Sequence, residues 1–331
     1  MTPDLLRLTD VTIEFGSPKK PIRVVEGVSF SIGRGESVGL VGESGSGKSV
    51  TSLAIMRLIG GRVVQGRIEF EGRNLLDLPA SALPEIRGRD IAMIFQEPMS
   101  SLNPLMTVGD QIGEALLLHG WRDRTKRRER TIEMLRLVGI PNAEGRLGAY
   151  PHQFSGGMRQ RVMIAMAVAC EPKLLIADEP TTALDVTIQA QVLDLMKTVR
   201  RELGMAILLI SHDLGVIADV CERVVVMYAG RVVEEADIRT ILTRPQHPYT
   251  RGLLRSVPRR GHEAERLYQI PGSVPPAGSI RQGCPFRDRC ELAVSRCAEE
   301  MPPMFRFGPS QSAACWVTAA AEGVTQAGAA A

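Results

Sequence analysis

A short run of glycine, serine and lysine residues has the composition and spacing of a loop that binds phosphate. Residues 42–49 follow the pattern G-x-x-x-x-G-K-S. The glycines allow successive backbone N–H groups to turn toward one anion. Lys48 would reach the β- and γ-phosphates of a nucleotide, and the hydroxyl of Ser49 would ligate Mg²⁺. The sequence therefore predicts a phosphate-binding loop formed by Gly42, Glu43, Ser44, Gly45, Ser46, Gly47, Lys48 and Ser49.

Two acidic residues at the end of an apolar segment have the chemistry to complete such a site. Residues 174–177 are Leu-Leu-Ile-Ala, and Asp178 and Glu179 follow directly. A buried strand that ends in carboxylates delivers them to the sheet edge where ligands of α/β proteins bind. Asp178 would hold Mg²⁺ opposite Ser49, and Glu179 would polarise the water that attacks the γ-phosphate.

The elements around these residues fit an α/β fold. Residues 37–41 are predicted to form a buried strand before the loop, and residues 50–59 a helix after it, which is the context that the loop motif requires. The helix start would add the positive end of its dipole. Short apolar strands at 206–210 and 224–227, separated by helices, indicate a mostly parallel sheet.

The N-terminal residues have a different pattern. Residues 5–15 and 24–32 alternate apolar and polar side chains around a proline-containing turn, which predicts an antiparallel β subdomain. Phe15 lies on this pair just ahead of the loop. It is either an ordinary strand aromatic or a platform on which an adenine ring stacks. Further strands are predicted at 66–70 and 91–95.

A mostly helical segment runs from residue 98 to about residue 169, with helices predicted at 108–118, 131–138 and 159–169. We interpret it as a helical insert. The basic run at 122–130 within it has the charge to touch nucleic acid or anionic lipid head groups. A solvated helix face is the simpler interpretation.

Composition limits the class of protein only broadly. The 331 residues are 44% hydrophobic, which is enough for a real core in one large or two modest domains. The net charge of +3 neither indicates nor excludes a nucleic-acid partner. No run approaches the ~18 apolar residues of a membrane-spanning helix, and Asp4 and Arg7 stand where a signal peptide would be apolar. We expect a cytoplasmic protein that attaches to a membrane only through a partner.

A third motif carries a resemblance to a known family. Residues 154–160, Phe-Ser-Gly-Gly-Met-Arg-Gln, resemble the L-S-G-G-Q signature of ABC ATPases, although Phe154 replaces the leucine and Met158 the glutamine. The signature alone is a weak signal, but the resemblance covers about residues 5–235 and presents six elements in the family order. Besides the phosphate-binding loop and the acidic pair, the matching residues are Gln96 of the Q-loop, Ser155, Gly156 and Gly157 of the signature, Asp185 of the D-loop and the switch histidine His212.

The resemblance implies how such a site works. In the family, the signature of a second subunit closes the outer face of the γ-phosphate, so the site is completed by dimerisation. Ser155 and the two glycine amides after it would bind that phosphate across the interface. His212 would contact the γ-phosphate and orient the water with Glu179. Gln96 would ligate Mg²⁺, sense the nucleotide and pass its state to a transmembrane partner, while ATP binding closes the pair and hydrolysis releases it.

After residue 235 the composition shifts to proline and glycine. The stretches 245–254 and 270–276, with the cysteines after them, resemble the C-terminal extension of oligopeptide and dipeptide importer ATPases. This resemblance implies a nucleotide-binding domain over residues 1–235 and a small, irregular extension over residues 236–331. We expect a disordered tail from about residue 319.

The resemblance also implies a function and partners. The chain would power uptake of oligopeptides, dipeptides or a related solute such as nickel, at the cytoplasmic face of the inner membrane. It would work with a second ATPase subunit, commonly a sibling rather than a copy, two permease subunits and, indirectly, an external solute-binding protein, but not with nucleic acid. The alternative is a soluble ABC ATPase of DNA repair or translation. Those proteins carry long coiled coils, zinc-bearing insertions or two cassettes, and this sequence has neither sustained heptads nor a second G-x-x-x-x-G-K-[ST].

Four of the six cysteines lie in the extension: Cys284, Cys290, Cys297 and Cys315. Disulfides are disfavoured in a reducing cytoplasm, whereas four thiolates suit either Zn²⁺ or an iron–sulfur cluster. The spacings lack the C-x2-C pairs of most zinc ribbons. They resemble the tails of some dipeptide-importer ATPases that hold a [4Fe–4S] cluster, so we expect a structural cluster, with zinc as the alternative.

Overall fold

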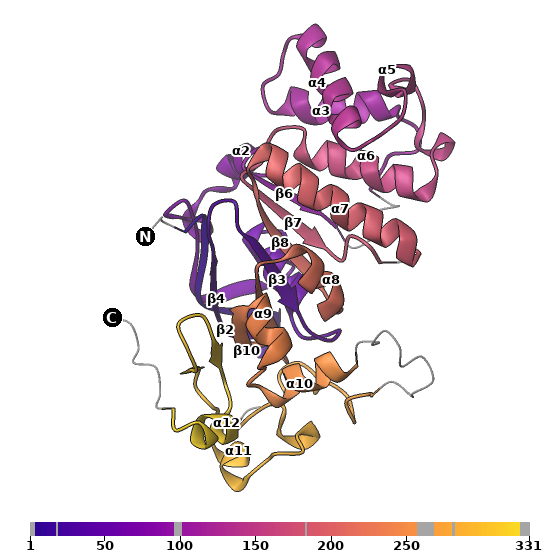
Figure 1. Cartoon of the computed structure of the whole chain (residues 1–331). Helices are drawn as coiled ribbons and strands as arrows, with labels where there is room; N and C mark the ends of the chain where they lie inside the picture. Colours follow the sequence, from indigo (N-terminus) through magenta and orange to yellow (C-terminus); the bar gives the residue numbers. More distant parts are fainter. Residues whose placement is uncertain are drawn as a thin grey trace. The chain divides into compact units, whose positions relative to one another are not determined.

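The computed structural model of the protein describes residues 4–17, 19–95, 101–182, 184–256, 268–279 and 282–324. These residues form two compact units. The first unit contains Gly33–Ser37 and Asp77–Leu209, together with the two N-terminal residues that lie outside the described part. The second unit contains Pro3–Ile32, Val38–Leu76 and Ile210–Ala331. Figure 1 shows their elements.

The strands of the first unit form a layer in the order β8-β7-β6. β6 (Ile91–Ile94) runs parallel to β7 (Leu174–Asp178), with Ile91 opposite Leu174. Every residue of β7 is buried, as expected for a parallel strand covered on both faces. β8 (Ala206–Ser211) follows α7 (Val186–Leu203), whose buried side chains include Val192, Met196 and Val199.

The predicted helical insert is observed as helices in the first unit. They are α3 (Val108–Leu118), α4 (Arg124–Leu137), α5 (Ala143–Arg146) and α6 (Gly156–Val168); a shorter helix, α2 (Leu83–Ile86), precedes β6. α4 begins before the predicted residue 131 because Asp123 caps it, accepting hydrogen bonds from the backbone N–H groups of Thr125 and Lys126.

The basic run falls on α4, and its interpretation as a solvated face is wrong for Arg130. This side chain is only 7% exposed. Its guanidinium pairs with Glu133 and Glu171 at 2.8 Å each and donates to the carbonyl of Ala169 at 3.1 Å. Arg130 therefore holds α4 against the segment that follows α6.

The second unit contains the predicted antiparallel subdomain as a sheet in the order β2-β1-β4-β5. β1 pairs with both of its neighbours, and its side chains Leu6, Leu8, Val11 and Ile13 are buried. The strands extend beyond the predicted limits: β1 (Leu6–Ser17), β2 (Lys20–Ile32), β4 (Arg62–Phe70) and β5 (Arg73–Asn74).

A further set of strands in this unit has the order β11-β12-β10-β9-β3. β3 (Ser37–Val41) is parallel to β9 (Arg223–Tyr228), and β10 (Arg231–Asp237) is antiparallel to β9. The phosphate-binding loop leads from β3 into α1 (Lys48–Ile55), while α8 (Leu214–Val220) leads into β9. β12 (Ser312–Ala313) pairs with β10 and with β11 (Phe305–Arg306).

The C-terminal extension consists of short elements, as its irregular composition predicts. Its helices are α9 (Ile238–Thr243), α10 (Pro248–Arg255), α11 (Ser295–Glu299) and α12 (Trp316–Ala321). α12 includes the start of the predicted disordered tail, and Ala319 is buried there, so that prediction begins too early.

Within the described residues, no helix is long and apolar enough to cross a membrane. Turns of 3₁₀ helix occur at Leu75–Asp77, Ala80–Ala82, Pro151–Gln153 and Arg287–Arg289.

One buried carboxylate organises the extension. Glu234 on β10 is fully buried and accepts hydrogen bonds from the backbone N–H groups of Gln246 at 2.7 Å and His247 at 2.8 Å. It also accepts from Nε2 of Gln311, next to β12, at 3.0 Å. Burial raises the pKa of Glu234, while these hydrogen bonds oppose the rise. The carboxylate thus joins β10 to the start of α10 and to the terminal hairpin.

Candidate nucleotide site

The phosphate-binding loop already holds its lysine in place. Lys48 is buried, and its Nζ donates to the carbonyl oxygens of Gly42 at 2.6 Å and Glu43 at 2.9 Å. It also donates to Oγ of Ser46 at 3.2 Å. The loop therefore combines a fixed cation with turned backbone N–H groups at a helix start, which is the chemistry of an anion site.

At two positions of this loop, any residue other than glycine would strain the backbone or clash with a neighbour. Gly47 caps α1 with a φ of 97°, in the region that side chains with a Cβ avoid. A Cβ at Gly42 would lie 2.2 Å from the carbonyl oxygen of Met227. The conformation of the loop thus depends on both residues.

Phe15 lies near the end of β1 and is half-buried. Its ring packs against the backbone at Gly61, where an added Cβ would come within 2.9 Å of its Cε2. This position agrees with both interpretations of Phe15, and its stacking on adenine stays a prediction.

The acidic pair ends β7 as predicted. Asp178 is 3% exposed. Glu179 has a φ of 48°, a left-handed backbone that costs a non-glycine residue roughly 1–3 kcal/mol and that is concentrated at functional sites. Its Oε2 accepts a hydrogen bond from Oγ1 of Thr182 at 2.9 Å. Thr182, which no sequence motif indicated, therefore orients the carboxylate expected to act on water.

The signature lies at the start of α6. Ser155 caps this helix, accepting from the backbone N–H of Met158 at 3.4 Å, and both Ser155 and Gly156 are exposed. Gly157 is half-buried against Ile188. The signature thus presents a serine hydroxyl and a helix N-terminus on the surface of its unit.

Gln160, by contrast, has a structural role that sequence reasoning missed. It is 2% exposed, and its Nε2 donates to the carbonyl oxygen of Pro180. Since Pro180 follows Glu179 directly, Gln160 connects the signature helix to the loop that carries the acidic pair.

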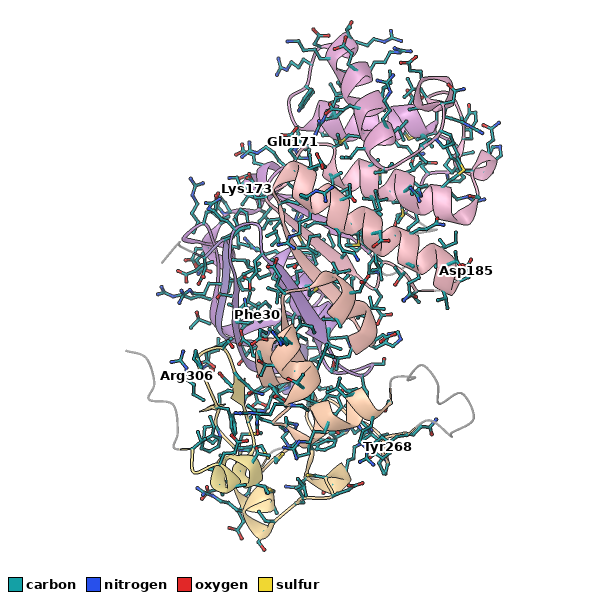
Figure 2. The ribbon with its side chains drawn as sticks, in the orientation of Figure 1. Phe30, Glu171, Lys173, Asp185, Tyr268 and Arg306 are labelled. Carbon is teal, nitrogen blue, oxygen red and sulfur yellow. The ribbon has the colours of Figure 1, made fainter. Side chains whose placement is uncertain are left out.

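Two further predicted residues, His212 and Asp185, lie at the ends of secondary-structure elements. His212 is exposed directly after β8. Asp185, labelled in Figure 2, caps α7 by accepting from the backbone N–H of Ile188 at 2.9 Å. Gln96 and the first residue of the D-loop, Ala183, lie outside the described residues.

The predicted site residues therefore form two sets, one in each compact unit. The second unit holds Phe15, the phosphate-binding loop and His212. The first unit holds the acidic pair, the signature and Asp185.

Two residues of the C-terminal extension contact the phosphate-binding loop, and neither was predicted from the sequence. The backbone N–H of Glu43 donates to the hydroxyl of Tyr249 at 2.8 Å. The carboxylate of Glu43 pairs with Arg289 at 2.8 Å. Both contacts lie within the second unit.

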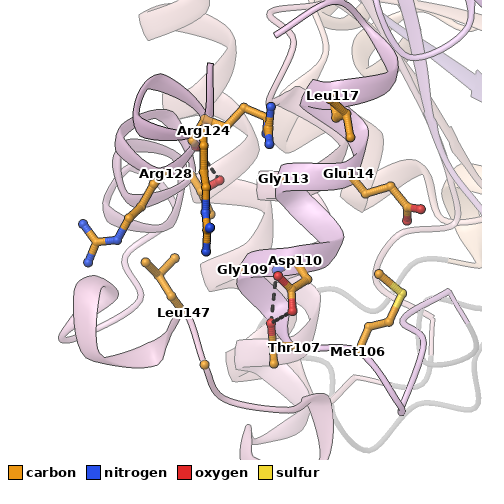
Figure 3. A pocket seen from close by; sticks show the side chains of 13 residues that line it. Met106, Thr107, Gly109, Asp110, Gly113, Glu114, Leu117, Arg124, Arg128 and Leu147 are labelled. Carbon is orange, nitrogen blue, oxygen red and sulfur yellow. Dashed lines mark hydrogen bonds between the residues drawn. The ribbon is translucent and has the colours of Figure 1, made fainter. Parts of the chain in front are cut away.

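A cavity of about 560 Å³ lies in the helical insert and is separate from these groups. Figure 3 shows it between α3 and α4, with charged side chains of both signs in its wall. Asp110 in this wall accepts a hydrogen bond from Thr107 at 2.6 Å. None of the predicted site residues lines the cavity.

The four cysteines of the extension, Cys284, Cys290, Cys297 and Cys315, are free thiols. None of the six cysteines, all of which are described, forms a disulfide. Within the described part of the chain, no group of three or more His, Cys, Asp or Glu residues is arranged to hold a metal ion. The described residues therefore give no support to the expected [4Fe–4S] cluster or to its alternative, a zinc site.

The thiols nevertheless influence one another. Burial raises the pKa of the Cys284 thiol to about 12, and Cys297, Cys315 and Cys290 add to the rise. In addition, the backbone N–H of Cys284 donates to the carbonyl of Cys297 at 2.7 Å.

Two features define a nucleotide-hydrolysing protein of the phosphate-loop class: a glycine-rich loop that leads from a strand into a helix, and a strand that ends in an acidic pair. Residues 25–182 match the ABC transporter family. Residues 233–297 match a second family, described as the oligopeptide/dipeptide transporter C-terminal region.

Curated relatives and solved structures agree with this class. A probable peptide ABC transporter ATP-binding protein, y4tR of Sinorhizobium fredii, is 52% identical over 317 residues, covering 94% of each chain. The dipeptide transport ATP-binding protein DppD of Escherichia coli is 48% identical over 313 residues, covering 94% of this chain and 96% of DppD. The dimeric structure of MJ0796, a bacterial ABC transporter cassette, aligns with a TM-score of 0.63 and 30% identity over 71% of this chain and 99% of that one. This chain belongs to the ABC transporter family, and it is an ATPase of that family.

Proposed function

We propose that the chain hydrolyses ATP to power the import of oligopeptides or dipeptides through a membrane transporter. The observation that carries this proposal is the pairing of an ABC cassette with a match to the oligopeptide/dipeptide transporter C-terminal region at residues 233–297. Relatives named as peptide or dipeptide transport proteins support it, because the similarity extends over 94% of the chain.

The proposed chemistry assigns one task to each predicted group. Lys48 and the loop amides bind the phosphates, and Ser49, Asp178 and Gln96 hold Mg²⁺, which neutralises phosphate charge when bound. Glu179 polarises the attacking water, and His212 orients it. The hydrogen bond from Thr182 and the left-handed backbone of Glu179 support this role, since both fix the direction of the carboxylate.

We further propose that the signature acts on a nucleotide held by a second ATPase subunit, either a sibling or a copy. Its support is the start of α6, where Ser155 and Gly156 are exposed and Gly157 is half-buried. Asp185, exposed at the start of α7, would belong to the same interface. Two permease subunits and an external solute-binding protein complete the proposed transporter, with this chain at the cytoplasmic face of the membrane.

The cysteines Cys284, Cys290, Cys297 and Cys315 are proposed to hold a [4Fe–4S] cluster with a structural role. Thiolate ligation would add order to an extension whose helices and strands are short. Protein purified without oxygen should be brown and contain iron and sulfide, and Cys290→Ser should bleach it while ATP binding persists. Colourless protein with one zinc per chain would instead establish the zinc alternative, and protein with neither would make the thiols ordinary buried side chains.

The Glu179→Gln variant tests the proposed chemistry. The amide keeps the size and hydrogen bonding of the side chain but removes its charge, so ATP should still bind while steady-state turnover falls by roughly 100-fold or more. The matched control is Glu202→Gln, an exposed carboxylate at the end of α7. Turnover equal to that of the parent protein would contradict the role of Glu179.

The same variant identifies the partners. Because it should retain ATP, it should hold the assembled complex during affinity purification from membranes of the native host. We expect two permease subunits and a second ATPase to co-purify. Recovery of ribosomes or nucleic acid in place of membrane proteins would reject the transporter assignment.

A further inference from the structure

Glu43 presents an electrostatic problem within the phosphate-binding loop. It is the second residue of that loop, and its side chain is 28% exposed. A carboxylate beside a site for a polyphosphate repels the ligand, and the repulsion is strongest where water is partly excluded. A loop that binds ATP must therefore offset this charge.

Arg289 supplies the opposite charge in a bidentate geometry. Its Nη1 lies 2.8 Å from Oε2 of Glu43, and its Nη2 lies 3.2 Å from Oε1. The arginine side chain is only 7% exposed, so salt and water screen the pair less than they screen a surface pair. Paired guanidinium and carboxylate groups in this geometry are among the stronger charge-assisted hydrogen bonds.

The remaining N–H groups of Arg289 fix its position. Nε donates to the carbonyl of Pro271 at 2.8 Å, and Nη2 donates to that of Ile270 at 3.2 Å. Nη1 also donates to the hydroxyl of Tyr228 at 3.3 Å. Together with Glu43, these acceptors match all five N–H donors of a guanidinium. The start of the proline-rich stretch 270–276 therefore fixes Arg289 through the carbonyl groups of Ile270 and Pro271.

The other stretch that marks the extension, residues 245–254, reaches the same loop residue. The Tyr249 hydroxyl accepts the backbone N–H of Glu43 at 2.8 Å, and Tyr249 is fully buried. Its ring packs against Tyr228 and Phe286, with centroid distances of 4.7 and 5.5 Å. Both the backbone and the side chain of Glu43 are thus fixed by the C-terminal extension.

We infer that Arg289 is a positioning residue of the nucleotide site: it neutralises Glu43 and, with Tyr249, holds the phosphate-binding loop, so that the C-terminal extension supplies part of the ATP site. This inference rests on the proposed role of residues 42–49 in binding the phosphates. It gives the extension a task within ATP binding itself, in addition to any contact with other subunits.

A charge-rescue experiment tests this inference. The Kd of a fluorescent ATP analogue is measured with the full-length chain, and Arg289→Ala should raise it roughly tenfold because Glu43 is left as an unpaired anion. Adding Glu43→Gln to that variant should restore the Kd to within about threefold, since the anion is then removed. Arg289→Lys, which keeps the charge but not the bidentate geometry, should give an intermediate value.

The kinetic signature separates this role from a general loss of structure. Arg289→Ala should raise KM for ATP while leaving kcat at saturating ATP nearly unchanged, whereas partial unfolding would lower kcat through a smaller active fraction. Arg306→Ala is the control, because Arg306 is an exposed arginine of the same extension that donates to Pro309 instead (Figure 2). It should change neither constant.

Distinct outcomes overturn the inference and the proposed function. Lys48→Ala should abolish binding; if it does not, the role of the phosphate-binding loop is wrong. If Lys48→Ala abolishes binding but Arg289→Ala leaves Kd unchanged, or if Glu43→Gln fails to rescue it, the role of Arg289 is wrong. Should Arg289→Ala not fold, Arg289→Lys decides: it keeps the charge but loses the bidentate geometry, so Kd should rise, and a Kd equal to that of the parent rejects the inference.

Discussion

Replacing Glu234 with alanine should open the junction between β10, α10 and the terminal hairpin. The change leaves two backbone donors without their acceptor, the N–H groups of Gln246 and His247, at 2.7 and 2.8 Å. It also removes one of the two acceptors of Nε2 of Gln311, at 3.0 Å, so that this group keeps only the carbonyl of Arg244. A buried donor without a partner costs about 1–3 kcal/mol. Because these costs are not additive and the buried carboxylate itself carries a desolvation cost, we expect a net loss of about 3–5 kcal/mol.

Hydrogen exchange measures this loss locally, which matters in a chain of two units that need not unfold together. The amides of α10 should exchange about two to four orders of magnitude faster in Glu234→Ala, while those of α7 in the other unit stay unchanged. Glu234→Gln keeps one acceptor oxygen, so the exchange rates of its α10 amides should lie between those of the parent protein and those of Glu234→Ala. An acceleration below about tenfold in α10 would refute the reasoning, because the carboxylate would then not be holding the junction.

Three further predictions concern single residues. Ser155→Ala should lower turnover of the assembled dimer but leave the Kd for ATP of the isolated chain almost unchanged; loss of binding by the isolated chain would contradict an action across the interface. Gly42→Ala should abolish ATP binding in the same titration, because the new Cβ would lie 2.2 Å from the carbonyl oxygen of Met227; binding like that of the parent would contradict the close approach. Burial, aided by Arg251, lowers the pKa of His247 to about 3. Below the unfolded pKa of about 6.5, the unfolded chain therefore binds a proton that the folded chain does not. The free energy of unfolding measured in urea should fall by about 2 kcal/mol between pH 8 and pH 5, and His247→Asn should remove this fall.

The sequence predicts a helix or strand well where the residues that determine it are close together in the chain. The strand before the phosphate-binding loop and the helix after it were expected because glycine spacing and apolar runs report on neighbouring residues. The limits of α3 were predicted correctly for a similar reason: Thr107 caps this helix within one turn.

Contacts between distant residues were not predictable in this way. Arg289 and Glu43 are 246 positions apart, and nothing in the local pattern of either residue indicates a partner. Gln160 and Arg130 have polar side chains that helical periodicity assigns to a surface, yet each is buried against a specific carbonyl oxygen. Periodicity reports the average polarity of a position, whereas these side chains are placed by acceptors in other segments.

The distance along the chain between Glu43 and its partners also affects the order of events during synthesis. Tyr249 and Arg289 follow Glu43 by 206 and 246 residues, so the ribosome makes the phosphate-binding loop long before either partner exists. Chains generally fold from the N-terminal end as they emerge. A nascent chain that ends before residue 289 therefore carries a loop whose carboxylate lacks its arginine, and the loop is completed only when the last segments of the protein have been made.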